Sequence, residues 1–521
     1  MSKSKQAAKS VTIIIIFTIA SKFLGFIRES LIAAKFGSGT ETDTFFIALT
    51  AVSLFSSMIT GSINTTMIPV LSEVEAREGK AGKKSHTNNL LSIISLISVA
   101  IIALAWVLSP NIIKILAPGF EGRQFKLAVL MMRIGLPTIF FAGIQGVFRG
   151  YLQSELMFTE SAASNFPFNF VYIFFLVFLS GFFGIKGLVV TSVLAVAAQI
   201  LIQIPGIRKA GFGYKYILDF KDRYVKKIIY LIPPVLVSVG VNDLNNIIDK
   251  SLASTLVAGS ISALNYANRL VGLTTGIFIS AIITVIFPML SQEANKDSYD
   301  GLKKVTIHGI NIVLLITIPA TIGMIVLANP IVKIAFERGA FDSTATYMTV
   351  GALIFYSIGL VGTAAKSMLG RVYYSLQDTK TPMIDSFITI GINIIFNFVL
   401  IKFMAHRGLA LATSISVIVT SVFLLLRLRK KIGAFGFSRS VKCGIKSLVA
   451  AIAMGVVVYF LDGILAKNMG SGTISELIAL LISAGVGVLI YFVLIYMFKI
   501  DEVDWVIRVV KDRLNKVVAR A

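Results

Sequence analysis

Apolar stretches long enough to cross a lipid bilayer follow one another along almost the whole chain, and this constrains the fold more than any other feature. A helix needs about 20 apolar residues to span the hydrocarbon layer. About fourteen stretches in the 521-residue sequence meet this criterion. They cover residues 11–35, 42–70, 88–110, 124–150, 162–182, 185–207, 228–256, 262–290, 305–330, 346–370, 383–403, 408–428, 445–463 and 474–499. The sequence therefore predicts an all-α polytopic membrane protein.

The composition excludes most other classes of protein. Hydrophobic residues make up 56% of the chain and charged residues 14%, whereas a soluble protein typically has about a quarter charged residues. With one cysteine and three histidines, the chain has too few ligands for a disulfide scaffold or a His/Cys metal cluster. The three histidines, His86, His308 and His406, are expected to be solvated.

The net charge of +23 suggests nucleic-acid binding only until the basic residues are located. They lie in short loops between apolar stretches, mostly in the loops after the second, sixth and twelfth stretches. Lys and Arg are retained on the cytoplasmic side of membranes, so both termini are predicted to be cytoplasmic. The tail, residues 501–521, is expected to form a basic amphipathic helix on the inner membrane surface, with a dedicated partner site as the alternative.

Short motifs recur about 220 residues apart and predict an internal duplication. Residues 68–72 (IPVLS) match 287–291 (FPMLS), 168–171 match 396–399 (both FNFV), and 187–188 match 408–409 (both GL). Units of six stretches insert with the same orientation, which predicts two parallel six-helix lobes around a central cavity. The expected divisions are 1–210, 211–432, two extra helices in 433–500, and the tail 501–521. Coincidental similarity among apolar helices is the alternative.

Charged residues occur inside several apolar stretches. An arginine at the bilayer centre costs roughly 2.5–3.5 kcal/mol on insertion scales, so such residues usually face a cavity or a partner. Lys22 and Arg28 in the first stretch and Arg269 in the eighth are expected to converge on one anion. Snorkelling of each side chain to the headgroups is the alternative. Glu29 and Asp43 are expected to pair with nearby basic residues.

A second set of polar residues could bind a hard monovalent cation. Asn393 and Asn397 share a helix face, and Thr413 and Asp249 add a hydroxyl and a carboxylate. Oxygen ligands suit such an ion, so sodium is the candidate coupling ion, and no other cofactor is expected. The alternative is that these side chains only form interhelical hydrogen bonds.

Several longer motifs resemble those of the MurJ (MviN) family of lipid II flippases. They include Leu24–Glu29 (LGFIRE), Phe336–Asp342 (FERGAFD) and Leu376–Pro382 (LQDTKTP). The resemblance implies a fourteen-helix transporter in the bacterial cytoplasmic membrane. Such a transporter carries the undecaprenyl-diphosphate-linked peptidoglycan precursor from the inner to the outer leaflet by alternating access. The last two helices would form a groove for the polyprenyl tail.

The resemblance also assigns roles to individual positions. The family's cavity cations fall on Arg28, Arg269 and Lys22, and an acidic position falls on Asp43. A sodium site would fall on Asp249, Asn393, Asn397 and Thr413. The chain departs from the family where Ser56 and Ser57 replace an arginine pair, which removes positive charge from the cavity.

Other functions remain open at this stage. A flippase for another undecaprenyl-linked oligosaccharide, of the O-antigen, teichoic or capsule type, is the main alternative. A cation-coupled drug exporter fits a basic cavity less well. No Asp-x-Asp metal motif is present, so an enzyme is not expected. The expected partners are the lipid substrate, membrane lipids and the cell-wall synthesis machinery.

Overall fold

The computed structural model describes residues 3–296, 298–470, 472–500 and 502. Side chains are described from residue 17 onward within these ranges, except in 231–243 and at 281. The expected amphipathic tail, apart from Glu502, lies outside the described residues.

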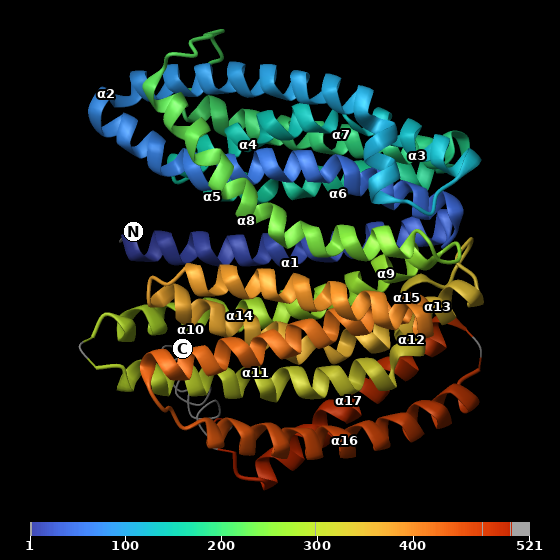
Figure 1. The fold of residues 1–521 in the computed structure, drawn as a ribbon. Helices are drawn as coiled ribbons and strands as arrows, with labels where there is room; N and C mark the ends of the chain where they lie inside the picture. Colours follow the sequence, from blue (N-terminus) through green and yellow to red (C-terminus); the bar gives the residue numbers. More distant parts are fainter. Residues whose placement is uncertain (1–2, 297, 471, 501, 503–521) are drawn as a thin grey trace. The chain divides into compact units, whose positions relative to one another are not determined.

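Every regular element in these ranges is helical, which confirms the all-α prediction (Figure 1). In chain order the elements are α1 (Lys3–Phe36), α2 (Thr40–Leu116), α3 (Gly122–Gly135), α4 (Thr138–Ser154), α5 (Phe158–Ala163), α6 (Asn165–Phe174), the π-helical turn η1 (Phe175–Leu179), α7 (Ser180–Lys209), α8 (Arg223–Ala253), α9 (Ser260–Thr274), the π-helical turn η2 (Thr275–Ile279), α10 (Ser280–Ala294), α11 (Asp300–Val326), α12 (Ala328–Phe336), α13 (Ser343–Ile358), α14 (Leu360–Ser375), α15 (Lys380–Ile432), α16 (Phe437–Asn468) and α17 (Thr473–Met497).

Three long helices are broken between two expected membrane stretches. α2, α7 and α15 leave helical geometry at Gly79, Gly184 and Ala405. Among the described residues, seven helical segments are long and apolar enough to cross a membrane, or up to nine if two bent pairs count as one span each. Since three of the seven contain these breaks, the count of seven understates the number of crossings. Each of the expected stretches falls on a helical segment of the structure.

The chain divides into two compact units. Unit 1 comprises Met1–Ser262 together with Arg338–Asp342, and unit 2 comprises Ala263–Glu337 and Ser343–Ala521. These units are defined by contacts, whereas the lobes expected from the repeat end at residues 210 and 432. The lobe boundaries therefore remain predictions.

The backbone itself repeats at the spacing of the sequence motifs. Four pairs of residues with positive φ lie 221 or 222 positions apart: Gly37 and Gly259, Leu156 and Gln377, Gly184 and Ala405, and Gly211 and Gly433. Positive φ is uncommon, particularly outside glycine. Its recurrence at nearly the same offset indicates that the two halves of the chain share several of their turns.

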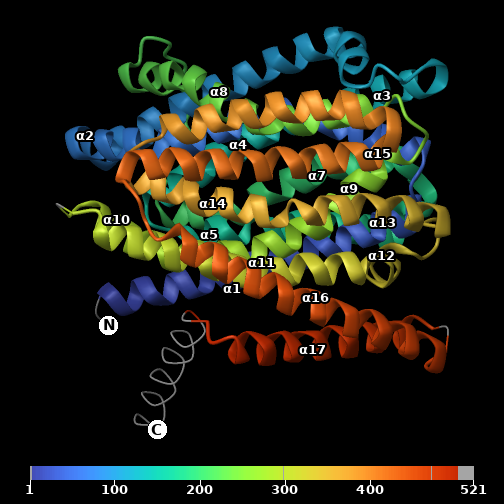
Figure 2. The ribbon, with the colours of Figure 1, turned by 60° about the horizontal axis from the view of Figure 1, so that its bottom comes forward.

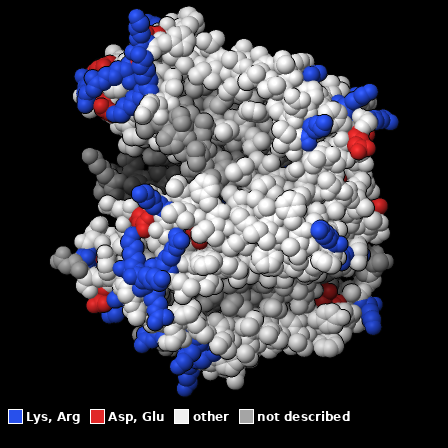
Figure 3. Space-filling model, in the orientation of Figure 1, with Lys and Arg blue, Asp and Glu red and all other residues white. Residues whose placement is uncertain are grey.

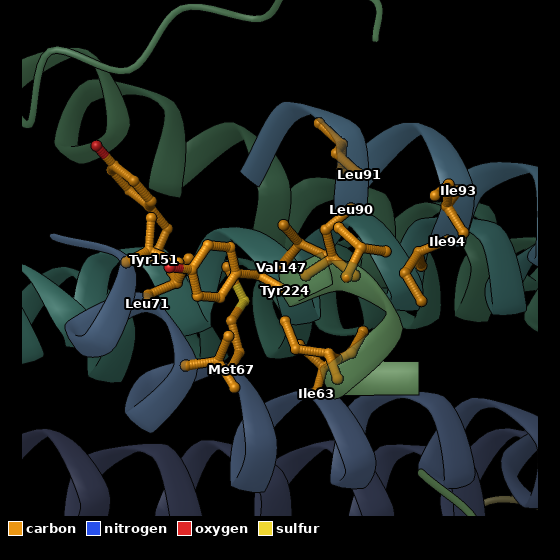
Figure 4. Close-up of a cluster of buried hydrophobic side chains, with 14 of the residues drawn as sticks. Ile63, Met67, Leu71, Leu90, Leu91, Ile93, Ile94, Val147, Tyr151 and Tyr224 are labelled. Carbon is orange, nitrogen blue, oxygen red and sulfur yellow. The ribbon is translucent and has the colours of Figure 1, made fainter. Parts of the chain in front are cut away.

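The core of unit 1 forms where α2 folds back on itself at Gly79. Ile63 and Met67 from its first half meet Leu90 and Ile94 from its second half, and Tyr151 of α4 completes the cluster (Figure 4). All five side chains are buried. Unit 2 has two comparable clusters, one of them between α11, α16 and α17.

Large apolar side chains also cover the outside of the helices. Phe182 and Phe403 are 85% and 81% exposed, which would be a liability in water. In Figure 3 the Lys and Arg side chains on the visible face collect toward the ends of the helices, and the surface between them is mostly uncharged. A bilayer covers such a band, and the charged ends lie at its two surfaces.

Candidate substrate-binding and ion-binding sites

Arg28 is held in a cage within unit 1. Its guanidinium lies over the rings of Phe168 and Tyr172, 5.2 and 5.1 Å from their centroids. It donates to Asn169 Oδ1 at 3.2 Å and to Glu29 Oε1 at 2.7 Å. The side chain is 14% exposed. α1 supplies the cation, while α6 supplies the amide and both rings, so the packing of these two helices fixes the guanidinium.

Of the two other charged residues expected near Arg28 on α1, Glu29 pairs with it and Lys22 does not. Glu29 is the expected acidic partner and is 5% exposed in this pair. Lys22 is half-buried and forms no hydrogen bond or ion pair with a residue that the structure describes. Six residues of helix correspond to about 9 Å along the axis and 120° around it. Lys22 and Arg28 therefore lie on different faces of α1.

Asp43 pairs with no basic residue in the part of the chain that the structure describes, so that expectation is wrong. Its carboxylate accepts hydrogen bonds from the backbone N–H groups of Gly259 and Ser262, each at 2.7 Å, and from Ser262 Oγ at 2.5 Å. Asp43 is 3% exposed. Because α9 begins at Ser260, the carboxylate satisfies N–H groups that a helix start leaves unpaired. Its contacts place Asp43 in the packing of unit 1.

Four turns of unit 1 are joined to one another by hydrogen bonds. Ala340 N donates to Ala34 O at 2.8 Å, and Ser38 Oγ donates to Gly259 O at 3.1 Å. Gly119 N donates to Ser254 Oγ at 3.2 Å. These turns follow the first, third, seventh and ninth expected stretches, so the predicted topology places all four on one side of the membrane. The sequence motif Phe336–Asp342 supplies the last of them.

Arg269 belongs to α9 in unit 2 and is exposed. On the same helix Tyr266 is fully buried and packs on Phe336 of α12, with ring centroids 4.9 Å apart. The contact between Tyr266 and Phe336 anchors α9, and the Arg269 side chain on the same helix remains exposed. The anion site expected from Lys22, Arg28 and Arg269 thus has two members in unit 1 and one in unit 2.

Three of the four expected cation ligands are brought together in unit 2. Asn397 Nδ2 donates to Asn393 Oδ1 at 2.8 Å, and Asn393 Nδ2 donates to Thr413 Oγ1 at 3.2 Å. Both asparagines are fully buried. The break at Ala405 folds the second half of α15 against the first and so creates this trio. Asp249, the fourth residue, is buried on α8 in unit 1.

A polar network in unit 1 was not predicted. Lys83 is 1% exposed, and its Nζ lies 2.7 Å from Glu75 Oε2 and 2.5 Å from Glu155 Oε1. The same atom lies 5.5 Å from the centre of the Tyr151 ring. The sequence shows these residues only as loop charges. Their pairing depends on how the break of α2 at Gly79 packs against the end of α4.

Two of the three histidines are not solvated as expected. His86 lies between Glu78 Oε2, at 2.7 Å, and Asp222 Oδ2, at 2.6 Å. Burial by itself lowers the pKa of His86, but the hydrogen bonds to Asp222 and Glu78 outweigh it and raise the pKa above its usual value. His406 is 7% exposed, with Nε2 at 3.0 Å from Met348 O. His308 is exposed, as expected.

Ser56 and Ser57, which stand where the sequence resemblance led us to expect an arginine pair, are bonded to their own helix. Ser56 Oγ donates to Val52 O and Ser57 Oγ donates to Leu54 O, both at 3.2 Å. Each of these contacts is a local return bond to the backbone of α2. This part of α2 therefore contributes no charge.

The sequence matches a known protein family and several known proteins. The model of the family described as "Lipid II flippase MurJ" matches residues 32–480. A probable lipid II flippase MurJ from Vibrio cholerae serotype O1 is 30% identical over 474 residues, which are 88% of this chain and 90% of that protein. One from Haemophilus influenzae is 30% identical over 462 residues, 85% and 90% of the two chains.

Solved structures agree on the fold. The structure titled "Lipid II flippase MurJ, inward closed conformation" superposes with a TM-score of 0.79 at 25% identity, over 94% of this chain and 99% of that one. An inward-facing multidrug resistance MATE family transporter of the MOP superfamily gives 0.69 at 14% identity, over 81% and 98%. These matches confirm the polytopic fold and the resemblance seen in the sequence. The chain belongs to the MurJ lipid II flippase family, a family of multi-pass membrane transporters and not of enzymes.

Proposed function

We propose that this protein carries lipid II from the inner to the outer leaflet of the bacterial cytoplasmic membrane by alternating access. The observation that supports this most is the family match over residues 32–480, which spans both units. The relatives named above are described as probable lipid II flippases, and this chain covers 90% of the length of each. The caged arginine on α1 supplies the chemistry that a diphosphate requires.

Arg28 is the central residue of the proposed diphosphate site. A guanidinium has five N–H donors in one plane, a geometry that fits phosphate oxygens. Glu29 and Asn169 each accept from one terminal nitrogen of Arg28, so other donors are available to a ligand. Two aromatic rings hold the plane in place, which reduces the entropy lost on binding. Arg269 is proposed to contact the same anion, and the long side chain of Lys22 is proposed to reach it from the adjacent face of α1.

Glu29 is proposed to neutralise Arg28 while no substrate is bound. A diphosphate would compete with this carboxylate for the guanidinium, so binding exchanges one charged partner for another. Asp43 is proposed to act indirectly, because its oxygens already accept from Gly259 and Ser262. It would hold the start of α9, the helix that carries Arg269.

The proposed function also includes an orientation in the membrane and a region that binds the lipid tail. Both termini are proposed to be cytoplasmic, on the evidence of the basic loops. The helices α16 and α17 are proposed to bind the polyprenyl tail. Only 28% of the most apolar window of each is buried within the structure, which leaves apolar surface for a lipid chain.

The proposed function is tested by rescue. A bacterium depleted of its own flippase would express this protein, and lipid II reaching the outer face would be measured with an impermeant probe. We expect rescue by the native chain and at least a tenfold loss with Arg28→Ala, because charge-assisted hydrogen bonds contribute about 1.5–3 kcal/mol each. Arg133→Ala, which changes an arginine bonded to Ser109 on the neighbouring helix, is the control.

A second substrate is favoured by one observation. Because Ser56 and Ser57 contribute no charge, the substrate contacts of this chain differ from those of relatives with arginines there. If the native chain inserts normally but does not rescue lipid II transport, the proposal is wrong. A flippase for another undecaprenyl-linked oligosaccharide then becomes the leading candidate.

A further inference from the structure

Unit 2 contains an open cavity of about 430 Å³ that none of the proposed diphosphate-binding residues lines. Its walls come from η2 with the start of α10, from α14, and from α15. Hydroxyl side chains are frequent among them: Thr275, Ser280, Thr363, Ser367, Tyr374 and Ser386. The turn η2 is π-helical, a geometry that frequently occurs at functional sites. The cavity is therefore more than a packing gap between apolar helices.

Lys366 places a positive charge on this cavity. Its Nζ lies 2.8 Å from Asp385 Oδ2 and also donates to Thr389 Oγ1. The Asp385 side chain is 2% exposed and that of Lys366 is 22% exposed. The lysine thus lies between a buried carboxylate and the cavity. An ammonium has three N–H donors, so one remains for a ligand.

Arg371 adds a second cation on the next turns of α14. Its guanidinium carbon is 5.6 Å from the centre of the Phe287 ring and 5.9 Å from that of Tyr374. It makes no hydrogen bond or ion pair with any residue in the described part of the chain. The rings fix the plane of the guanidinium, while its edge stays available to a planar acceptor such as a carboxylate.

The charges do not cancel within the cavity. Asp385 neutralises Lys366, and Arg371 leaves one positive charge in excess. Ionisable residues within membrane helices are costly and generally serve a site. An excess of one positive charge beside several hydroxyl groups is suited to a single anionic group.

We propose that this cavity binds one anionic group of the transported headgroup, a carboxylate or a phosphate, through Lys366 and Arg371. The proposal rests on the proposed function. The two sources of such a group in lipid II are the stem peptide and the diphosphate. Binding at this second point would orient the headgroup relative to its lipid anchor.

The test measures equilibrium binding to the full-length protein in nanodiscs. Three probes are compared: lipid II, lipid II with its peptide carboxylates amidated, and undecaprenyl diphosphate. With Arg371→Gln we expect affinity for lipid II to fall about tenfold. With Asp385→Asn we expect it to rise, because Lys366 loses its counter-ion. Lys402→Gln, an exposed lysine farther along α15, is the control.

The opposite signs of the two variants separate a binding role from a structural one. A loss confined to lipid II with free carboxylates identifies the stem peptide, and a loss for undecaprenyl diphosphate identifies the phosphate. Unchanged affinity in both variants, with native binding intact, overturns this proposal alone. Failure of the native chain to bind lipid II overturns the proposed function instead.

Discussion

Several charged residues in this protein form hydrogen bonds with partners that are far away in the sequence. Arg28 is bonded to Asn169, 141 positions later, and His86 to Asp222, 136 positions later. Local sequence marked Arg28 as unusual because a charge interrupts an apolar stretch. It gave no comparable signal for His86, which lies in a loop rich in charge.

The His86 contacts make the stability of unit 1 depend on pH. His86 lies between the two membrane stretches of α2, and its pKa is raised in the folded state. The stabilisation of the folded state by His86 is therefore fully present below the unfolded pKa of about 6.5. It is lost as the pH rises through the higher pKa of the folded state. We expect His86→Gln to lower the melting temperature most at mildly acidic pH and least at alkaline pH.

Asp222→Asn is the variant matched to His86→Gln, because it removes one of the two acidic partners of His86. The pKa of Asp222 is lowered: burial raises it, but bonds to Asn89 and His86 outweigh that. Its contribution is present above the unfolded pKa and is lost only as the pH falls through the lower folded value. If the difference in melting temperature between the native protein and His86→Gln stayed constant between pH 5 and pH 9, this account of His86 would be contradicted.

The prediction that sodium is the coupling ion can be tested at Asp249. If sodium binds with Asn393, Asn397 and Thr413 as its other ligands, the native chain should transport faster with sodium than with potassium. Asp249→Ala should abolish that difference, because it removes the carboxylate of the set. Transport would be compared in the two salts, with the exposed Asp300→Ala as control. A native rate independent of sodium would remove the hypothesis.

At the scale of elements, breaks and turns decide how the helices meet. Sequence patterns predicted each apolar stretch but not that α2, α7 and α15 run through a break as single segments. The specific motif Leu376–Pro382 also has a structural role. Asp378 accepts from Thr381 N at 2.9 Å at the start of α15 and lies 2.5 Å from Lys431 near its end. This motif therefore connects the two ends of one folded-back helix.

Gly339 is the element-scale test of the turn that joins residues 338–342 to α1. Its φ is +62°, and a Cβ would lie 2.3 Å from Ala34 O. We expect Gly339→Ala to destabilise the protein by about 1–3 kcal/mol, because strain and a steric clash combine. Thermal unfolding in detergent measures the loss. Gly39→Ala is the control, since a Cβ there meets nothing within 4 Å.

At the scale of the whole molecule, charge distribution determines the orientation in the membrane. The only cysteine, Cys443, is buried in α16, so a Cys443→Ser background allows single cysteines to be introduced. In intact cells we expect an impermeant thiol reagent to label Lys467→Cys, in the last turn of α16, and not Lys215→Cys, in the loop before α8.

Disrupted cells provide the control for this topology. Both positions should then react, because Lys215 is expected to lie on the cytoplasmic side of an intact membrane. Labelling of Lys215→Cys in intact cells would reverse the predicted orientation of both termini.

The sequence by itself determined the helical class, the membrane environment, the approximate spans and the family. These follow from local properties, because about 20 consecutive apolar residues suffice to define a membrane helix. Only the tertiary structure decided the role of Asp43 at the start of α9, the cage around Arg28 and the cavity beside Lys366. Helices that are apolar on all sides carry little periodic signal about which face meets which neighbour, so these contacts emerge only when the helices pack.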